Sequence, residues 1–169
     1  MAAKRSTCIV VGIFIIAASL FGFLPQTMAE TWNVKFFLHT TKAEAVPIPD
    51  AEGHRVGMIV REGVSIYDNK ELAWTKVVVI SDLIKGVGSF SQYAIETFQD
   101  GSTMTGYAKG TVGGPQTQFI GEIIHGTGRF QGIKGTTTST AVKMLPPEKG
   151  EIVGKAVGEL TITFTLPSK

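Results

Sequence analysis

The fold of this chain is decided by a glycine-rich stretch, GTGRFQGIKG, at residues 126–135. Four glycines in ten residues surround one aromatic residue, Phe130, and a threonine-rich run at residues 136–144 follows at once. Glycine permits a positive φ and a close approach of backbone segments, which tight turns and the corners of β-barrels require. We therefore expect a corner at which Phe130 plugs the end of a barrel before the chain re-enters the sheet.

Alternating apolar and polar residues on both sides of this corner predict β-strands. The clearest case is residues 32–39, where Trp32, Val34, Phe36 and Leu38 alternate with polar residues. Further strand-like runs lie at residues 55–61 with 64–67, 74–80, 90–99, 102–112, 117–124, 136–144 and 152–166. The expected fold class is all-β, an eight-stranded antiparallel up-and-down barrel, because closure removes exposed sheet edges. A β-sandwich is the alternative.

Turn signals assign side chains to the two faces of the predicted sheet. A two-residue turn at Asp100-Gly101 would place Glu96 opposite Thr105, and a turn at Gly113-Gly114 would place Thr105 opposite Glu122. One face, predicted to be the core, then holds Tyr93, Ile95, Thr97, Met104, Gly106, Ala108, Phe119, Gly121 and Ile123. The other face, predicted to be solvated, holds Glu96, Phe98, Thr105, Tyr107, Lys109, Gln118 and Glu122. The run Val77–Ile80 suggests a strand buried on both faces.

The first 29 residues predict a secretory signal peptide. Lys4 and Arg5 precede an apolar run at residues 9–24, and Thr27-Met28-Ala29 is a small-x-small cleavage site. Cleavage between Ala29 and Glu30 leaves residues 30–169 as a single barrel domain, exported to the periplasm or the extracellular space. The apolar run is slightly long, so an uncleaved N-terminal anchor is the alternative.

Loss of the leader changes the charge and the cysteine content. Two of the 16 basic residues go with it, which leaves 14 basic against 14 acidic residues. A neutral domain gives no reason to expect nucleic acid or a membrane surface as a partner. The single cysteine, Cys8, is also lost, so the fold is expected to depend on its core without a disulfide.

The order of elements around the corner resembles a known group of barrels. A meander, a Gly-Thr-Gly-x-Phe-x-Gly-x-x-Gly corner, a threonine-rich strand and a closing strand are similar to the allene oxide cyclase-like and dirigent-like barrels, which are lipocalin-like in shape. The matching residues are Gly126, Thr127, Gly128, Phe130, Gly132 and Gly135. The resemblance covers residues 88–166 and is strongest to bacterial exported members. It implies an eight-stranded barrel. Plant members isomerise or guide reactive small molecules in an apolar cavity, and some are trimers.

The candidate ligand-binding residues are apolar side chains expected inside such a barrel. They are Trp32, Phe36, Trp74, Tyr93, Ile95, Met104, Phe119, Ile123 and Phe164. An eight-stranded barrel is just wide enough to be filled by side chains or to hold one small ligand, so both arrangements stay open. No catalytic residue of the resembling family matches a position in this chain.

Other chemistry has weak support in the sequence. Glu96 and Glu122 would lie about 10 Å apart, two strands from each other on the solvated face, which is wide for a shared proton or one metal. His39, His54 and His125 have no metal-binding spacing, so neither a metal nor a cofactor is expected.

Three functions follow from these observations. The first is an exported barrel that binds an apolar small molecule, with isomerase- or cyclase-like activity as a further option. The second is a structural or interaction barrel of the cell envelope with a filled core, in which outward Phe37 and Tyr107 mark a homo-oligomer surface. The third and least supported is a hydrolase or metalloenzyme.

Overall fold

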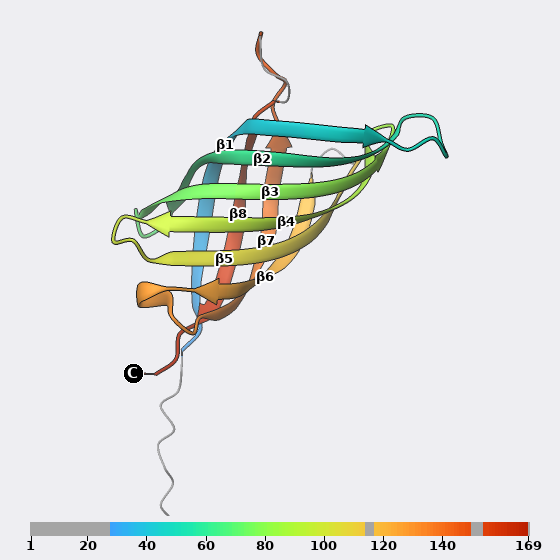
Figure 1. Ribbon diagram of the computed structural model, residues 1–169. Helices are drawn as coiled ribbons and strands as arrows, with labels where there is room; N and C mark the ends of the chain where they lie inside the picture. Colours follow the sequence, from blue (N-terminus) through green and yellow to red (C-terminus); the bar gives the residue numbers. More distant parts are fainter. Residues whose placement is uncertain (1–27, 114–116, 150–153, 169) are drawn as a thin grey trace, which may run out of the picture.

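The chain forms a closed antiparallel β-barrel. The computed structural model describes residues 28–113, 117–149 and 154–168. Eight strands pair in sequence order and β1 closes against β8, which confirms the predicted eight-stranded barrel (Figure 1). The strands are β1 (Glu30–Pro47), β2 (His54–Tyr67), β3 (Leu72–Ile84), β4 (Val87–Phe98), β5 (Thr103–Val112), β6 (Gln118–Gly126), β7 (Lys134–Met144) and β8 (Ala156–Thr165).

Most of the predicted signal peptide, residues 1–27, lies outside the described residues. Strand β1 begins at Glu30, the residue after the predicted cleavage position. Among the described residues, helix is limited to one 3-10 turn, and no helix there is long and apolar enough to cross a membrane.

The predicted register between β4 and β5 is wrong by one residue. Phe98 and Ser102 are joined by a backbone hydrogen bond across a three-residue loop, in which Gly101 has a φ of +79°. Glu96 therefore pairs with Met104 instead of Thr105. Because side chains alternate along a strand, this shift moves every β4 residue to the opposite face. Tyr93 and Ile95 point outward, whereas Glu96 and Phe98 are buried.

The predicted inner faces of β5 and β6 are correct. Met104, Ala108 and Phe119 are buried, because the shift between β5 and β6 is two residues and preserves the faces. In β1 and β8 the inward residues are also those expected, with Val34, Leu38, Ala156, Ile162 and Phe164 buried. In β3 the expectation of burial on both faces is wrong. Val77 and Val79 are inside, while Ile80 is 50% exposed on the outer surface.

The glycine-rich corner closes one end of the barrel. Strand β6 ends at Gly126, a 3-10 turn spans Gly128–Phe130, and β7 begins at Lys134. A Cβ atom at Gly126 would lie 2.3 Å from the carbonyl oxygen of Phe130, so only glycine fits there without a backbone shift. The Phe130 ring is 2% exposed, which confirms it as the predicted plug.

Phe130 belongs to a tightly packed aromatic cluster, which we call the plug. Its buried members are Val34, Tyr67, Ala73, Phe98, Met104, Phe130, Ile133, Ile162 and Phe164, and the partly buried Trp32 packs against them and is counted with them. Trp32 lies edge-on to Tyr67, Phe130 and Phe164, with ring centroids 4.6–6.0 Å apart. Edge-to-face packing of this kind adds to the stabilisation from burial. The plug therefore fills one end of the barrel.

Candidate functional site

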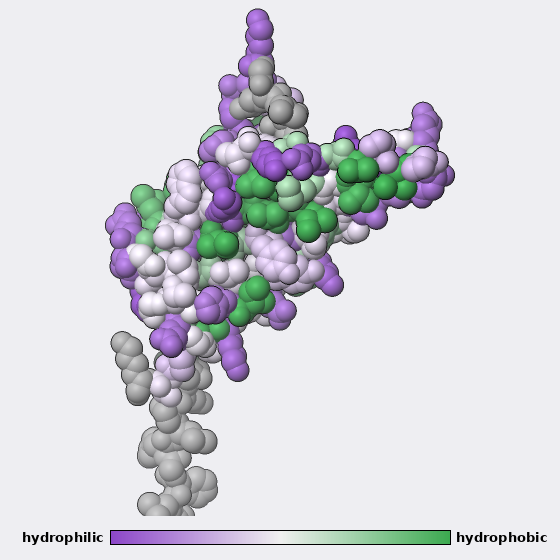
Figure 2. All heavy atoms as spheres, in the orientation of Figure 1, coloured by the Kyte–Doolittle hydropathy of each residue, from purple (hydrophilic) through white to green (hydrophobic). Residues whose placement is uncertain are grey.

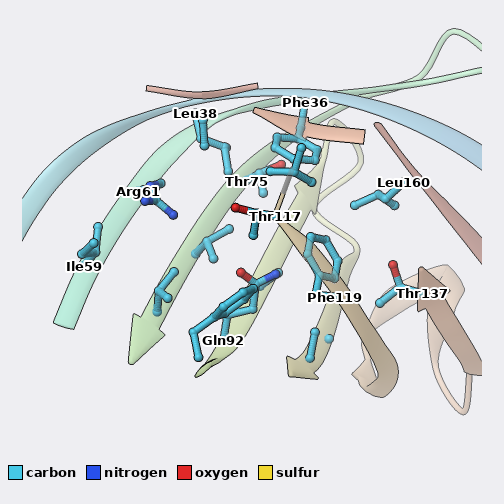
Figure 3. Close-up of a pocket in the computed structure, with 18 of the residues that line it drawn as sticks. Phe36, Leu38, Ile59, Arg61, Thr75, Gln92, Thr117, Phe119, Thr137 and Leu160 are labelled. Atoms are coloured by element: carbon cyan, nitrogen blue, oxygen red, sulfur yellow. The ribbon is translucent and has the colours of Figure 1, made fainter. Parts of the chain in front are cut away.

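A cavity of about 270 Å³ occupies the barrel interior beyond the plug (Figure 3). Its walls include a second apolar cluster, which consists of Leu38, Val77, Val79, Phe90, Ala108, Phe119, Val142 and Ala156. Toward the plug the lining reaches Met104 and Ile162, and toward the opposite end it reaches Leu83, Val112 and Met144. The described part of the interior is thus filled at one end and hollow beyond it.

Small residues keep this space open. Gly106 and Ala108 on β5 and Ala94 on β4 face the cavity, where larger side chains would fill it. On β8 the inward residues grow from Ala156 through Leu160 to Phe164, so the interior narrows toward the plug. The hollow therefore follows from the order of residue sizes along the strands.

The sequence-predicted ligand residues divide into three groups. Phe36, Met104, Phe119 and Ile123 line the cavity. Trp32 and Phe164 lie in the plug. Trp74, Tyr93 and Ile95 are on the outer surface, with 52%, 46% and 43% of their areas exposed, so they do not face the interior. The error in Tyr93 and Ile95 comes from the one-residue register shift. Trp74 is outward because its cross-strand neighbours, Val64 and Thr97, are outward.

Glu96 is a buried acid at the junction of the plug and the cavity. Its side chain accepts a hydrogen bond from the Tyr67 hydroxyl, and Ser65 and Thr75 lie beside it with their hydroxyls 2.7 Å apart. Burial raises the pKa of Glu96 above its ordinary value, because water that would solvate the carboxylate is absent. Glu96 and Glu122 do not share a solvated face as predicted, because Glu122 is exposed on the outer face whereas Glu96 is buried.

Arg61 is the cationic group that lines the cavity. It extends from β2 into the space, between Ile59 and Gly63 on the inward face of that strand (Figure 3). Burial lowers the pKa of the guanidinium, although an arginine in a protein stays protonated. Its Nε atom is buried and has no hydrogen-bond partner among the described residues.

Sequence reasoning missed both Arg61 and Glu96 as interior groups. The one-residue error in the β4–β5 register placed Glu96 outside, and the usual preference of charged side chains for water agreed with that placement. In β2 the more apolar set of alternating positions, which includes Val56, Val64 and Ile66, faces outward, so the pattern points to the wrong inner face. Ile59 and Tyr67 lie an even number of residues from Arg61 and therefore on the same face of β2. These two apolar residues are the one signal in the sequence that Arg61 faces inward.

The histidines lie apart from the cavity. His54, at the start of β2, bonds Asp82 through Nε2 at 2.8 Å and Asp50 through Nδ1. These two carboxylates raise the pKa of His54 by favouring its charged form. Within the described ranges, no group of three or more His, Cys, Asp or Glu side chains is arranged to hold a metal ion.

Comparison with known proteins gives no family assignment. No protein-family model matches the chain, and no curated protein shows significant similarity to it.

Proposed function

We propose that this protein is a small exported β-barrel that binds an apolar small molecule in its interior. The observation that carries the proposal is the apolar cavity of about 270 Å³ beside a packed plug. Small-molecule sites are typically preformed hollows with apolar walls and a few placed polar groups. The walls here are mostly aliphatic and aromatic, while Arg61, Gln92 and Glu96 supply the polar groups.

Export and family membership belong to the same proposal. The leader-like residues 1–29 support export. The Gly126–Gly135 corner supports kinship with the allene oxide cyclase-like and dirigent-like barrels, because the corner packs Phe130 as a plug. Detection of the mature chain in a periplasmic or culture fraction, with Glu30 as its first residue by N-terminal sequencing, tests the export.

Isomerase- or cyclase-like chemistry would require a proton donor in the cavity. Glu96 is the candidate, because its carboxyl lines the cavity and burial raises its pKa, which favours the protonated form. Binding is the main proposal, and catalysis is secondary to it. If the Glu96→Gln variant converts a bound substrate at the same rate as the wild type, Glu96 is not the proton donor.

Binding can be tested with a neutral apolar probe. We expect decanol to bind the mature protein with one-to-one stoichiometry in native mass spectrometry and titration calorimetry. Ala108→Phe should abolish binding, because Ala108 lines the cavity and a ring there would fill it. Thr138→Phe, on the exposed face of β7, is the matched control and should bind decanol as the wild type does. Absence of decanol binding to the folded wild type would contradict the proposal.

The outer surface supports a second candidate function, an interaction barrel. Apolar side chains group on the outer face of β2, β3 and β4 (Figure 2). They include Val64, Trp74, Ile80, Tyr93 and Ile95, each at least 36% exposed. Tyr93 also packs against Tyr107 of β5, with ring centroids 4.9 Å apart. Exposed apolar patches of this kind mark association surfaces in soluble proteins. The interaction barrel was predicted to have a filled core. The core is filled only at the plug, because a cavity lies beyond it.

A further inference from the structure

Arg61 is half-buried, and it has none of the partners that an arginine inside a barrel normally has. Among the described residues it makes no ion pair and no side-chain hydrogen bond, and its Nε atom is buried and unsatisfied. A buried charge without a partner is costly, so buried arginines are usually paired with carboxylates. An arginine in this state is suited to a partner that comes from outside the chain.

The unsatisfied polar atoms of the described residues gather in the cavity. Two buried side-chain atoms there lack a hydrogen-bond partner, Arg61 Nε and Thr137 Oγ1. Both residues line the same cavity, Arg61 from β2 and Thr137 from β7 (Figure 3). Since nearly all buried polar atoms in proteins are satisfied, two exceptions in one hollow indicate where an occupant supplies polar atoms.

Glu96 does not serve as the counterion of Arg61. Its carboxylate accepts hydrogen bonds from Tyr67 and Ser65, and burial is the main cause of its raised pKa. Arg61 pairs across the strands with Thr40 and Val77, whereas Glu96 pairs with Thr75 and Met104, one inward-facing position nearer the plug. The cavity therefore contains a cation that the buried acid does not neutralise.

We propose that the cavity binds an amphiphilic carboxylate, whose anionic headgroup is held by the Arg61 guanidinium and whose apolar part packs against the aliphatic wall. This inference rests on the proposed function and specifies its ligand class. Arginine suits the task, because its planar fork matches the two oxygens of a carboxylate. The apolar part would contact Leu38, Val79, Phe90, Phe119 and Val142. A volume of about 270 Å³ is just below the usual range for small-molecule pockets, so the ligand is compact.

The test compares decanoate with decanol, which has the same chain and no charge. Calorimetric titrations at pH 8 use the wild type, Arg61→Met and the matched control Arg55→Met, which removes an exposed arginine from the same strand. We expect decanoate to bind the wild type more tightly than decanol does. Arg61→Met should weaken decanoate binding about tenfold to a hundredfold, as expected for a lost charge-assisted pair, and leave decanol binding unchanged. Arg55→Met should change neither.

Each alternative result is decisive. Equal binding of decanol and decanoate, unchanged in Arg61→Met, would overturn the headgroup inference and leave the proposed function standing. Binding of neither probe would overturn both. Acetate that binds as tightly as decanoate would show a site for a small anion only, which also overturns the inference. The comparison of the two probes on the wild type does not depend on the folding of any variant. Arg61→Lys keeps the charge but loses the planar guanidinium, so its decanoate affinity should lie between those of the wild type and Arg61→Met.

Discussion

The two ends of the barrel interior are built from the same strands but are filled in opposite ways. At one end Trp32, Phe98, Phe130 and Phe164 pack ring against ring. Beyond them small inward residues such as Ala94, Gly106 and Ala108 stand among larger ones, and a cavity of about 270 Å³ results. Alternation along each strand decides which residues point inward, and the sizes of those residues decide whether the interior is core or binding space.

The plug and the cavity each have a nearby arginine, and the two arginines differ in their hydrogen-bond partners. Arg129, outside the plug, donates two hydrogen bonds to Glu71 at 2.7 and 2.6 Å and lies over the rings of Phe98 and Phe130. Glu71 raises the pKa of Arg129 in return. Arg61, in the cavity, has neither a carboxylate nor a hydrogen-bond partner in the described chain. One arginine completes the fold, and the other is available to a ligand.

The largest expected effect is the loss of a ring from the plug. Phe130→Ala should lower the free energy of unfolding by about 3–5 kcal/mol, because it leaves a void among packed rings. Phe119→Ala should cost about 2–3 kcal/mol, since Phe119 already borders empty space and gives up fewer contacts. Urea unfolding of both variants measures the difference. Equal costs would show that the two ends are packed alike.

Glu96 should make stability depend on pH. Its pKa is raised in the folded protein from an ordinary value of 4.5, so above pH 4.5 the folded state retains a proton that the unfolded chain releases. Stability should therefore fall as pH rises through that window, by up to about 1.4 kcal/mol per pH unit, and level off above the folded pKa.

Unfolding of the wild type and Glu96→Gln across a pH series isolates this contribution, because the other carboxylates are common to both proteins. Glu122→Gln, on the exposed outer face, is the control and should follow the wild type. A Glu96→Gln profile parallel to that of the wild type would contradict the prediction.

The two arginines should respond to substitution with opposite signs. Arg61→Met should raise the free energy of unfolding by about 1–2 kcal/mol in the absence of ligand, since it removes an unpaired charge from an apolar wall. Arg129→Met should lower it by about 1–2 kcal/mol through loss of the paired hydrogen bonds to Glu71. Thermal and urea unfolding test both. A loss of stability in Arg61→Met would indicate that the guanidinium supports the fold.

The smallest effect on stability is expected on the outer face. Ile80→Lys should change the free energy of unfolding by less than about 0.5 kcal/mol, because Ile80 is already half exposed. If the outer apolar face of β2, β3 and β4 is an interface, this variant should reduce the mass measured by light scattering. Thr138→Lys, on the exposed face of β7, should have the mass of the wild type. A wild-type protein that stays monomeric at high concentration would exclude self-association through this face.

The sequence predicted the barrel well and its chemistry poorly. Strand positions and the plug follow from local patterns, such as alternation and the glycines that surround Phe130. The inner face of β4 depends on one extra loop residue, which the Asp100-Gly101 signal does not reveal. That single step placed Tyr93 and Ile95 inside and Glu96 outside, the reverse of the structure.

Arg61 was missed for a different reason. A charge on the inner face violates the pattern on which sequence interpretation depends, because in β2 the less apolar set of alternating positions, which includes Arg61, faces the cavity. Residues that break the general pattern are expected to concentrate at functional sites. The most informative positions in this chain are therefore those that the pattern gets wrong.

The pairing of β1 with β8 has a consequence for how this chain reaches its final state. Glu30 lies opposite Phe164, so the barrel cannot close until the last strand has been synthesised. Until then the incomplete sheet has two free edges, on which another chain can add a strand. Contacts between residues so far apart in sequence also slow folding. We expect the pairing of β1 with β8 to be a late step in folding, before which the open sheet can associate with other chains. The yield of folded protein should therefore depend on the time that passes before β8 pairs with β1.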